Sequence, residues 1–192
     1  MKICVYGAAS DLILQKYKDI CFELGAQMVK RGHSLVYGAG GHGVMGATAR
    51  GVTSENGYIL GIVPTFFKEQ KTEHLYEGCS KVIWTETMYE RKELLEENSD
   101  AFIIAPGGIG TYDEFFAVLT NKQLGQHEKP IAVFNAYGFY NEFLDIFNKA
   151  VNEGFLNASC MQLFKFLDTP EEVIKYIETA PVDYDKSKLK NG

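Results

Sequence analysis

The sequence lacks any apolar run of the roughly 18 residues that a membrane-spanning helix needs. We therefore expect a protein that does not enter a membrane and stays in the cytoplasm. Clusters of lysine and arginine are lacking too: 19 basic residues stand against 25 acidic ones, and the formal net charge is -6. This balance argues against a nucleic-acid partner, which requires a basic surface. A small anionic ligand is still allowed, because a few backbone amides can bind it.

Cysteine and histidine are scarce, with four of each. The cysteines lie far apart and form no C-x-x-C pair, so we expect reduced thiols. The histidines show no metal-ligand spacing with each other or with the cysteines, so we predict no metal site.

The pattern of apolar residues predicts an α/β fold. Of the 192 residues, 46% are hydrophobic and 23% charged, which suits one buried core. We expect a single domain over residues 1–180 and a frayed polar tail over residues 181–192. Short β-branched and aromatic runs alternate with segments of helical period, which indicates an open parallel sheet of about seven strands with helices on both faces.

The predicted strands cover residues 2–6, 34–37, 58–63, 81–85, 101–105, 130–135 and 164–167. The predicted helices cover an amphipathic segment around residues 17–28 that stops at Gly32, and then residues 44–56, 88–98, 112–124, 139–152 and 171–178.

A glycine-rich segment, Pro-Gly-Gly-Ile-Gly-Thr at 106–111, follows the apolar strand at 101–105 and leads into a helix. Ligands of open parallel sheets bind beyond the carboxyl ends of strands, where backbone amides at a helix start meet a phosphate. Gly107, Gly108 and Gly110 would let the backbone approach such a ligand, and Thr111 would add a hydroxyl donor. The alternative is a tight strand-to-helix turn in which Thr111 is the N-cap.

A second glycine-rich loop at 38–46 formally contains G-x-G-x-x-G, but it follows the second strand, and no acidic residue ends the next strand. NAD binding is therefore disfavoured, and no P-loop motif occurs. The loop after the first strand, residues 7–11, supplies another turn and the hydroxyl of Ser10 at the same sheet edge.

Two charged residues are candidates for chemistry near this edge. Arg91 lies in the first turn of a helix, where the helix dipole favours acidic residues, so its presence indicates a local task. The alternative is a solvated charge run with a Thr87-x-x-Glu90 capping box. Glu114 faces the end of the glycine-rich segment; its alternative is a capping box with Thr111, and the residues alone leave both questions open.

Together these segments resemble the Lonely Guy family. Residues 106–114 resemble its P-G-G-x-G-T-x-x-E motif, Met-Tyr-Glu-Arg-Lys at 88–92 resembles its M-x-x-R-K motif, and the loop at 38–46 matches a third segment. The resemblance runs from residue 2 to about residue 177. It implies a Rossmann-like fold, a homodimer, and hydrolysis of the N-glycosidic bond of a cytokinin riboside 5'-monophosphate, an N6-prenylated AMP, with plain AMP as a possible second substrate.

The resemblance also implies roles for single residues. Arg91 and Glu114 would form the catalytic pair, and the amides of the 106–111 segment would bind the 5'-phosphate. Met88 and Lys92 would line the site, and Gly41 would contact the substrate. Ser10 is a further expected contact, although the first loop departs from the family's G-S-x-x-G-like stretch.

No cofactor is expected. The family is often mislabelled as lysine decarboxylase, but neither a Schiff-base lysine nor a partner for a pyridoxal ring can be identified. The competing interpretation is a non-catalytic nucleotide or cofactor carrier of the same fold. For a prenyl chain, the apolar candidates are Met88, Phe115 and Phe116.

Overall fold

The computed structural model describes residues 1–70 and 74–180. The strands are β1 (Lys2–Tyr6), β2 (Ser34–Tyr37), β3 (Ile59–Pro64), β4 (Lys81–Thr85), β5 (Ala101–Ile104), β6 (Ile131–Phe134) and β7 (Lys165–Leu167). The α-helices are α1 (Gln15–Lys30), α2 (Gly43–Ser54), α3 (Thr65–Gln70), α4 (Met88–Glu97), α5 (Ile109–Gln123), α6 (Asn141–Asn152) and α7 (Pro170–Thr179). Short 3-10 turns are η1 (Ala136–Gly138) and η2 (Ala158–Gln162).

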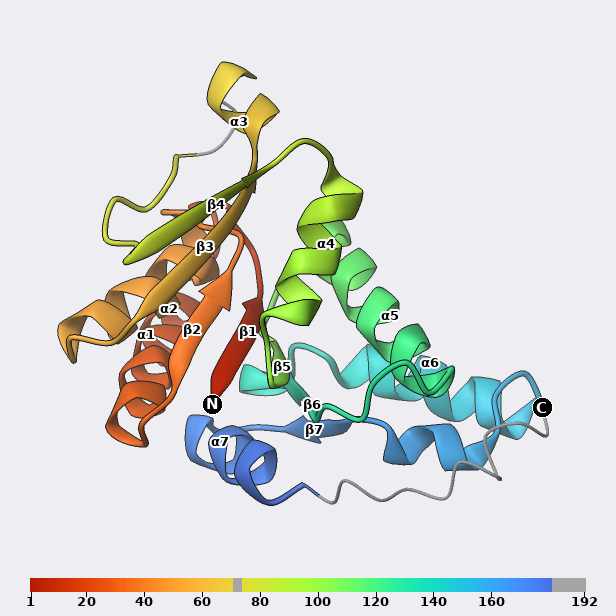
Figure 1. The fold of residues 1–192 in the computed structure, drawn as a ribbon. Coiled ribbons are helices and arrows are strands. Elements are labelled where there is room, and N and C mark those ends of the chain that lie inside the picture. The colour runs from red at the N-terminus through yellow and green to blue at the C-terminus, as the bar shows by residue number, and fades with distance from the viewer. Residues whose placement is uncertain (71–73, 181–192) are drawn as a thin grey trace.

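The seven strands form one sheet in the order β4-β3-β2-β1-β5-β6-β7, and every neighbouring pair is parallel (Figure 1). The chain builds outward from β1 to β4 and then returns across the sheet to place β5 on the other side of β1. The connections therefore reverse direction between β1 and β5, which is the point where ligands bind in open α/β sheets. The predicted fold class is confirmed.

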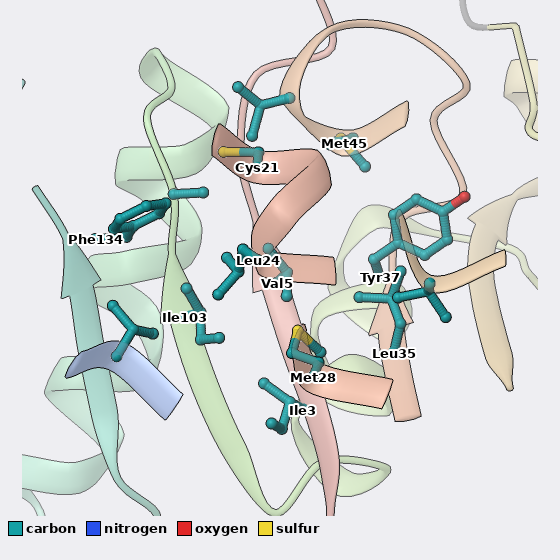
Figure 2. Packing of buried hydrophobic residues seen from close by; sticks show 14 of the residues in the cluster. Ile3, Val5, Cys21, Leu24, Met28, Leu35, Tyr37, Met45, Ile103 and Phe134 are labelled. Carbon is teal, nitrogen blue, oxygen red and sulfur yellow. The ribbon is translucent and has the colours of Figure 1, made fainter. Parts of the chain in front are cut away.

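Two apolar layers cover the sheet. On one face, α1, α2 and α7 pack against the strands; Figure 2 shows Leu24 and Met28 of α1 lying over Ile3 and Val5 of β1. On the other face, α4, α5 and α6 enclose a second cluster. Because strand side chains alternate between faces, Cys4 and Tyr6 of β1 belong to that second cluster.

Every predicted strand lies within one residue of its observed bounds. The helices differ more. The short helix α3 was not predicted. Helix α5 begins at Ile109, earlier than predicted, because Gly108 takes an extended conformation as its N-cap. Helix α6 begins at Asn141, because the 3-10 turn before it contains Tyr137 at φ 56°.

The structure also bears on the cysteines, on membrane-spanning helices and on the C-terminal residues. All four cysteines are free thiols, as predicted. No helix within the described residues has the length and apolar character needed to cross a membrane. The predicted tail at 181–192 lies outside the described residues.

Candidate active site

The loops that follow β1 and β5 meet at the carboxyl edge of the sheet. The amide of Ala8 donates to the carbonyl of Pro106 at 3.1 Å, and the amide of Ala105 donates to the carbonyl of Tyr6 at 2.8 Å. Beside this junction lies a crevice of about 420 Å³. It is lined by Ala8, Ser10, Leu12, Ile13, Leu14, Tyr17, Val44, Pro106, Gly107, Gly108 and Phe139.

The start of α5 presents free amides at this crevice. The first intrahelical bond runs from Tyr112 N to Gly108 O at 3.0 Å, and no described residue accepts a hydrogen bond from the amides of Ile109, Gly110 or Thr111. A Cβ placed on Gly108 or Gly110 would meet nothing within 4 Å. An anion can therefore approach these donors closely, and the helix dipole favours it.

Thr111 does not cap this helix. It lies inside the first turn with only 3% of its surface exposed, so the alternatives that make it an N-cap or half of a capping box with Glu114 are wrong. Its side chain packs under Gly107, where a Cβ would lie 2.1 Å from the Thr111 hydroxyl oxygen. Gly107 is thus required for the turn and the hydroxyl to fit together.

Arg91 is not part of a solvated charge run. Thr87 caps α4 by accepting from Glu90 N at 3.1 Å, and the Glu90 carboxylate accepts from Glu86 N at 2.7 Å. Glu90 therefore stabilises the helix start. Arg91 turns inward and is 6% exposed.

The buried guanidinium of Arg91 joins two elements. Its Nε donates to the carbonyl oxygen of Ile62 in β3 at 3.3 Å, and its Nη1 donates to Oε1 of Glu114 at 3.2 Å. The Glu114 side chain is 12% exposed. A charge pair this deeply buried makes each charge depend on its partner, because removing one leaves the other poorly solvated.

Neutral groups lie beneath the pair on β1. Burial, more than any other cause, raises the pKa of Cys4 to about 12. Burial also raises the pKa of Tyr6 well above its ordinary value, and the nearby charge of Glu114 adds to that effect. Cys4 is thus a thiol rather than a nucleophilic thiolate at neutral pH, which leaves Glu114 as the group of this cluster suited to interact with developing positive charge.

Lys92 points into a groove between α4 and α5 and not toward Glu114. Its Nζ donates to both carboxylate oxygens of Asp113, at 3.1 and 3.0 Å. This pair lines a groove of about 920 Å³ between α4 and α5, together with the exposed side chains of Tyr89 and Phe116. Met88, at the start of α4, is 37% exposed. The structure therefore brings Arg91 and Glu114 together and sets Lys92 apart from them, in the groove between α4 and α5.

The second glycine-rich loop has few free amides. Gly43 N donates to the Asp11 carboxylate at 3.0 Å, and Met45 N donates to Ala8 O at 3.1 Å. Gly41 N donates to His74 O at 2.7 Å. Asp11 thus occupies the position that a phosphate would take at the start of α2, and its pKa is lowered chiefly by the Gly43 amide. Ser10 is exposed at the crevice, and its hydroxyl accepts from Leu12 N at 3.2 Å.

Sequence reasoning missed two of these contributions. The Ile62 carbonyl that holds Arg91 is a backbone group in an apolar strand and leaves no trace in the sequence. Asp11 follows Ser10 in the loop after β1, and its bond to Gly43 at the end of the loop after β2 could not be predicted from spacing in the sequence.

The fold and this edge define the class: a Rossmann-like α/β protein with a crevice at the switch point of a parallel sheet. The sequence profile of the family described as "Possible lysine decarboxylase" matches residues 45–177. The chain belongs to this family, the Lonely Guy family of the resemblance above.

Curated relatives cover the chain almost entirely. A cytokinin riboside 5'-monophosphate phosphoribohydrolase of Arabidopsis thaliana is 35% identical over 191 residues, which is 100% of this chain and 89% of the relative. A probable enzyme of the same name from Oryza sativa subsp. japonica is 34% identical over 98% of this chain and 78% of its own length.

Solved structures share the fold. The molybdenum cofactor carrier protein of Chlamydomonas reinhardtii superposes with a TM-score of 0.69 at 18% identity, covering 92% of this chain and 95% of the carrier. The protein TM1055 superposes with a TM-score of 0.68 at 24% identity, covering 92% and 98%. These likenesses concern the fold alone.

Proposed function

We propose that the protein is a phosphoribohydrolase that cleaves the N-glycosidic bond of a cytokinin riboside 5'-monophosphate and releases the free base and ribose 5-phosphate. The observation that carries the proposal is the buried pair of Arg91 in α4 and Glu114 in α5, because Glu114 lies on the same helix as the free amides at the start of α5. The activity of the curated relatives named above supplies the substrate class.

Each part of the site has a role in this reaction. The amides of residues 109–111 bind the 5'-phosphate, so that Thr111 contributes its amide while its hydroxyl packs under Gly107. Gly107 and Gly108 form the turn, and Ser10 is a further contact at the crevice. Binding the phosphate fixes the nucleotide, so that binding energy remote from the reacting carbon contributes to catalysis.

Glu114 acts at the ribose. Cleavage of the glycosidic bond develops positive charge on the sugar, as in glycoside hydrolysis. A carboxylate close to that charge stabilises it and can also position and deprotonate the attacking water. Arg91 orients the Glu114 carboxylate through the 3.2 Å contact.

An N6-prenyl chain needs an apolar wall. Phe115 cannot provide one, because it is 1% exposed and packs in the core with Phe147 and Phe164. Met88 and Phe116 have exposed surface. We propose these two residues for the prenyl chain, with AMP as a second substrate that would leave the wall unused.

We also propose a cytoplasmic homodimer. The groove between α4 and α5, in which the exposed Tyr89 and Phe116 lie among charged and polar side chains, is the surface that a second copy would cover. We also propose Lys92 and Gly41 as substrate contacts. Lys92 is bonded to Asp113 in the groove, and the Gly41 amide is bonded to the carbonyl oxygen of His74.

The test is hydrolysis of N6-isopentenyladenosine monophosphate and of AMP by the parent chain and by Glu114→Gln and Arg91→Ala. The control is Glu142→Gln, which neutralises an exposed carboxylate on α6. We expect the parent and the control to release base and ribose 5-phosphate in equal amounts and at the same rate, and the two site variants to release both products about 100- to 10,000-fold more slowly. Tight nucleotide binding by the parent without any release would instead identify a carrier.

A further inference from the structure

The residue Gly38, directly after β2, lies against the guanidinium of Arg91. A Cβ built on Gly38 would stand 1.9 Å from Nη2 and 3.0 Å from Cζ of Arg91. These distances are far below van der Waals contact, so the guanidinium occupies the space that a side chain at position 38 would fill.

Contacts on several sides hold the backbone of this loop in place beside Arg91. Ala39 is fully buried and has φ 60°, a left-handed conformation that is costly for a residue with a Cβ. A Cβ on Gly61 of β3 would lie 2.8 Å from the Ala39 Cβ, so β3 closes one side. The Ala39 carbonyl also accepts from Tyr76 N at 2.9 Å.

The guanidinium is thereby held by three elements. β3 accepts from Nε through Ile62, α5 accepts from Nη1 through Glu114, and the Gly38 backbone lies beside Nη2. A planar guanidinium restrained on three sides keeps one orientation although its side chain has several rotatable bonds. That orientation sets where the Glu114 carboxylate points.

We propose that Gly38 is a positioning residue for catalysis: its missing side chain leaves the space that the Nη2 end of the Arg91 guanidinium occupies, and the guanidinium held there directs Glu114 toward the ribose. This inference rests on the proposed function. It also explains why this loop begins with a glycine. The amides of Gly41, Gly43 and Met45 are already bonded within the protein, so the glycine at position 38 makes room for Arg91 and not for a phosphate.

The test is a double-mutant cycle between Gly38→Ala and Arg91→Ala. The rate of base release at different nucleotide concentrations gives kcat and the KM for the nucleotide. Gly38→Ala should lower kcat about 100-fold, the effect expected of a displacement near 1 Å in a catalytic group, while KM changes little. In the Arg91→Ala background the same substitution should cost nothing further, because no guanidinium remains to be displaced. Losses that multiply in the double variant, or full activity in Gly38→Ala, would overturn the proposal.

The matched control is Gly40→Ala, two residues along the same loop. Its Cβ would approach Sδ and Cε of Met45 at 3.3 Å, the far end of a flexible side chain. We expect it to keep kcat within a few-fold of the parent and a similar melting temperature.

A second readout does not depend on activity. In a ¹⁵N NMR spectrum, the Nε–H signal of Arg91, assigned by its loss in Arg91→Ala, should shift or broaden in Gly38→Ala and stay in place in Gly40→Ala. If the parent hydrolyses no nucleotide, the proposed function fails, yet this comparison still decides whether Gly38 makes room for the Arg91 guanidinium. An unchanged Arg91 signal in a folded Gly38→Ala protein would refute this role of Gly38.

Discussion

Replacing Glu114 by glutamine separates the charge of the buried pair from its shape. Glutamine keeps an oxygen that can accept from Nη1 of Arg91 across the present 3.2 Å, but the guanidinium loses its counter-charge in a setting where Arg91 is 6% exposed. A hydrogen bond to a charged group contributes about 1.5–3 kcal/mol. For a chain of this size that loss corresponds to a melting temperature lower by roughly 3–12 °C.

The catalytic loss should be much larger than the stability loss. A glutamine neither deprotonates water nor stabilises a developing cation with a full charge, so kcat should fall about 100- to 10,000-fold. The assay is base release by chromatography, run beside a thermal melt of the same preparation with Glu142→Gln as the control. A variant that keeps more than a tenth of the parental kcat would refute the role given to Glu114, however its melting temperature moved.

Three other perturbations test the surroundings of the site. Gly107→Ala would place a Cβ 2.1 Å from the Thr111 hydroxyl, so AMP affinity measured by calorimetry should drop at least tenfold, and unchanged affinity would contradict a phosphate site there. Ala39→Gly removes a Cβ from a left-handed position; the melt should show unchanged or higher stability, by up to about 1 kcal/mol, and a large loss would show that the φ is not strained. Nε2 of His127 lies 2.9 Å from the carbonyl oxygen of Val118, and burial lowers the pKa of His127 below the ordinary 6.5, so the unfolded state binds the proton more readily. The free energy of unfolding should therefore be highest above pH 6.5 and decline as the pH falls through the folded-state pKa. Thermal melts of His127→Gln should lack this dependence on pH.

The sheet could be predicted closely because its strands are short β-branched and apolar runs separated by glycine-rich turns. Helix α3 escaped prediction because its six residues, Thr65–Gln70, are too few to show a helical period. The start of α5 was misplaced for a different reason. Three glycines in four positions favour a loop, yet Gly108 serves as an N-cap and Gly110 lies within the first turn.

The pairing of Arg91 with Glu114 was proposed from family likeness, whereas its geometry depends on strand order. β4 lies at the edge of the sheet and β5 near its centre, so α4 must return across the sheet and reach α5 (Figure 1). Spacing in the sequence does not reveal this return. The sequence likewise gave no sign that Lys92 bonds Asp113 in the groove or that Gly38 faces a guanidinium, because both depend on contacts between distant segments.

The most direct test of the account compares binding and cleavage on one preparation. The parent chain is mixed with N6-isopentenyladenosine monophosphate, bound nucleotide is measured by calorimetry at short times, and base and ribose 5-phosphate are quantified as the reaction proceeds. The account predicts multiple turnovers with equal amounts of the two products. Saturable binding of intact nucleotide, with no ribose 5-phosphate after prolonged incubation, would contradict it.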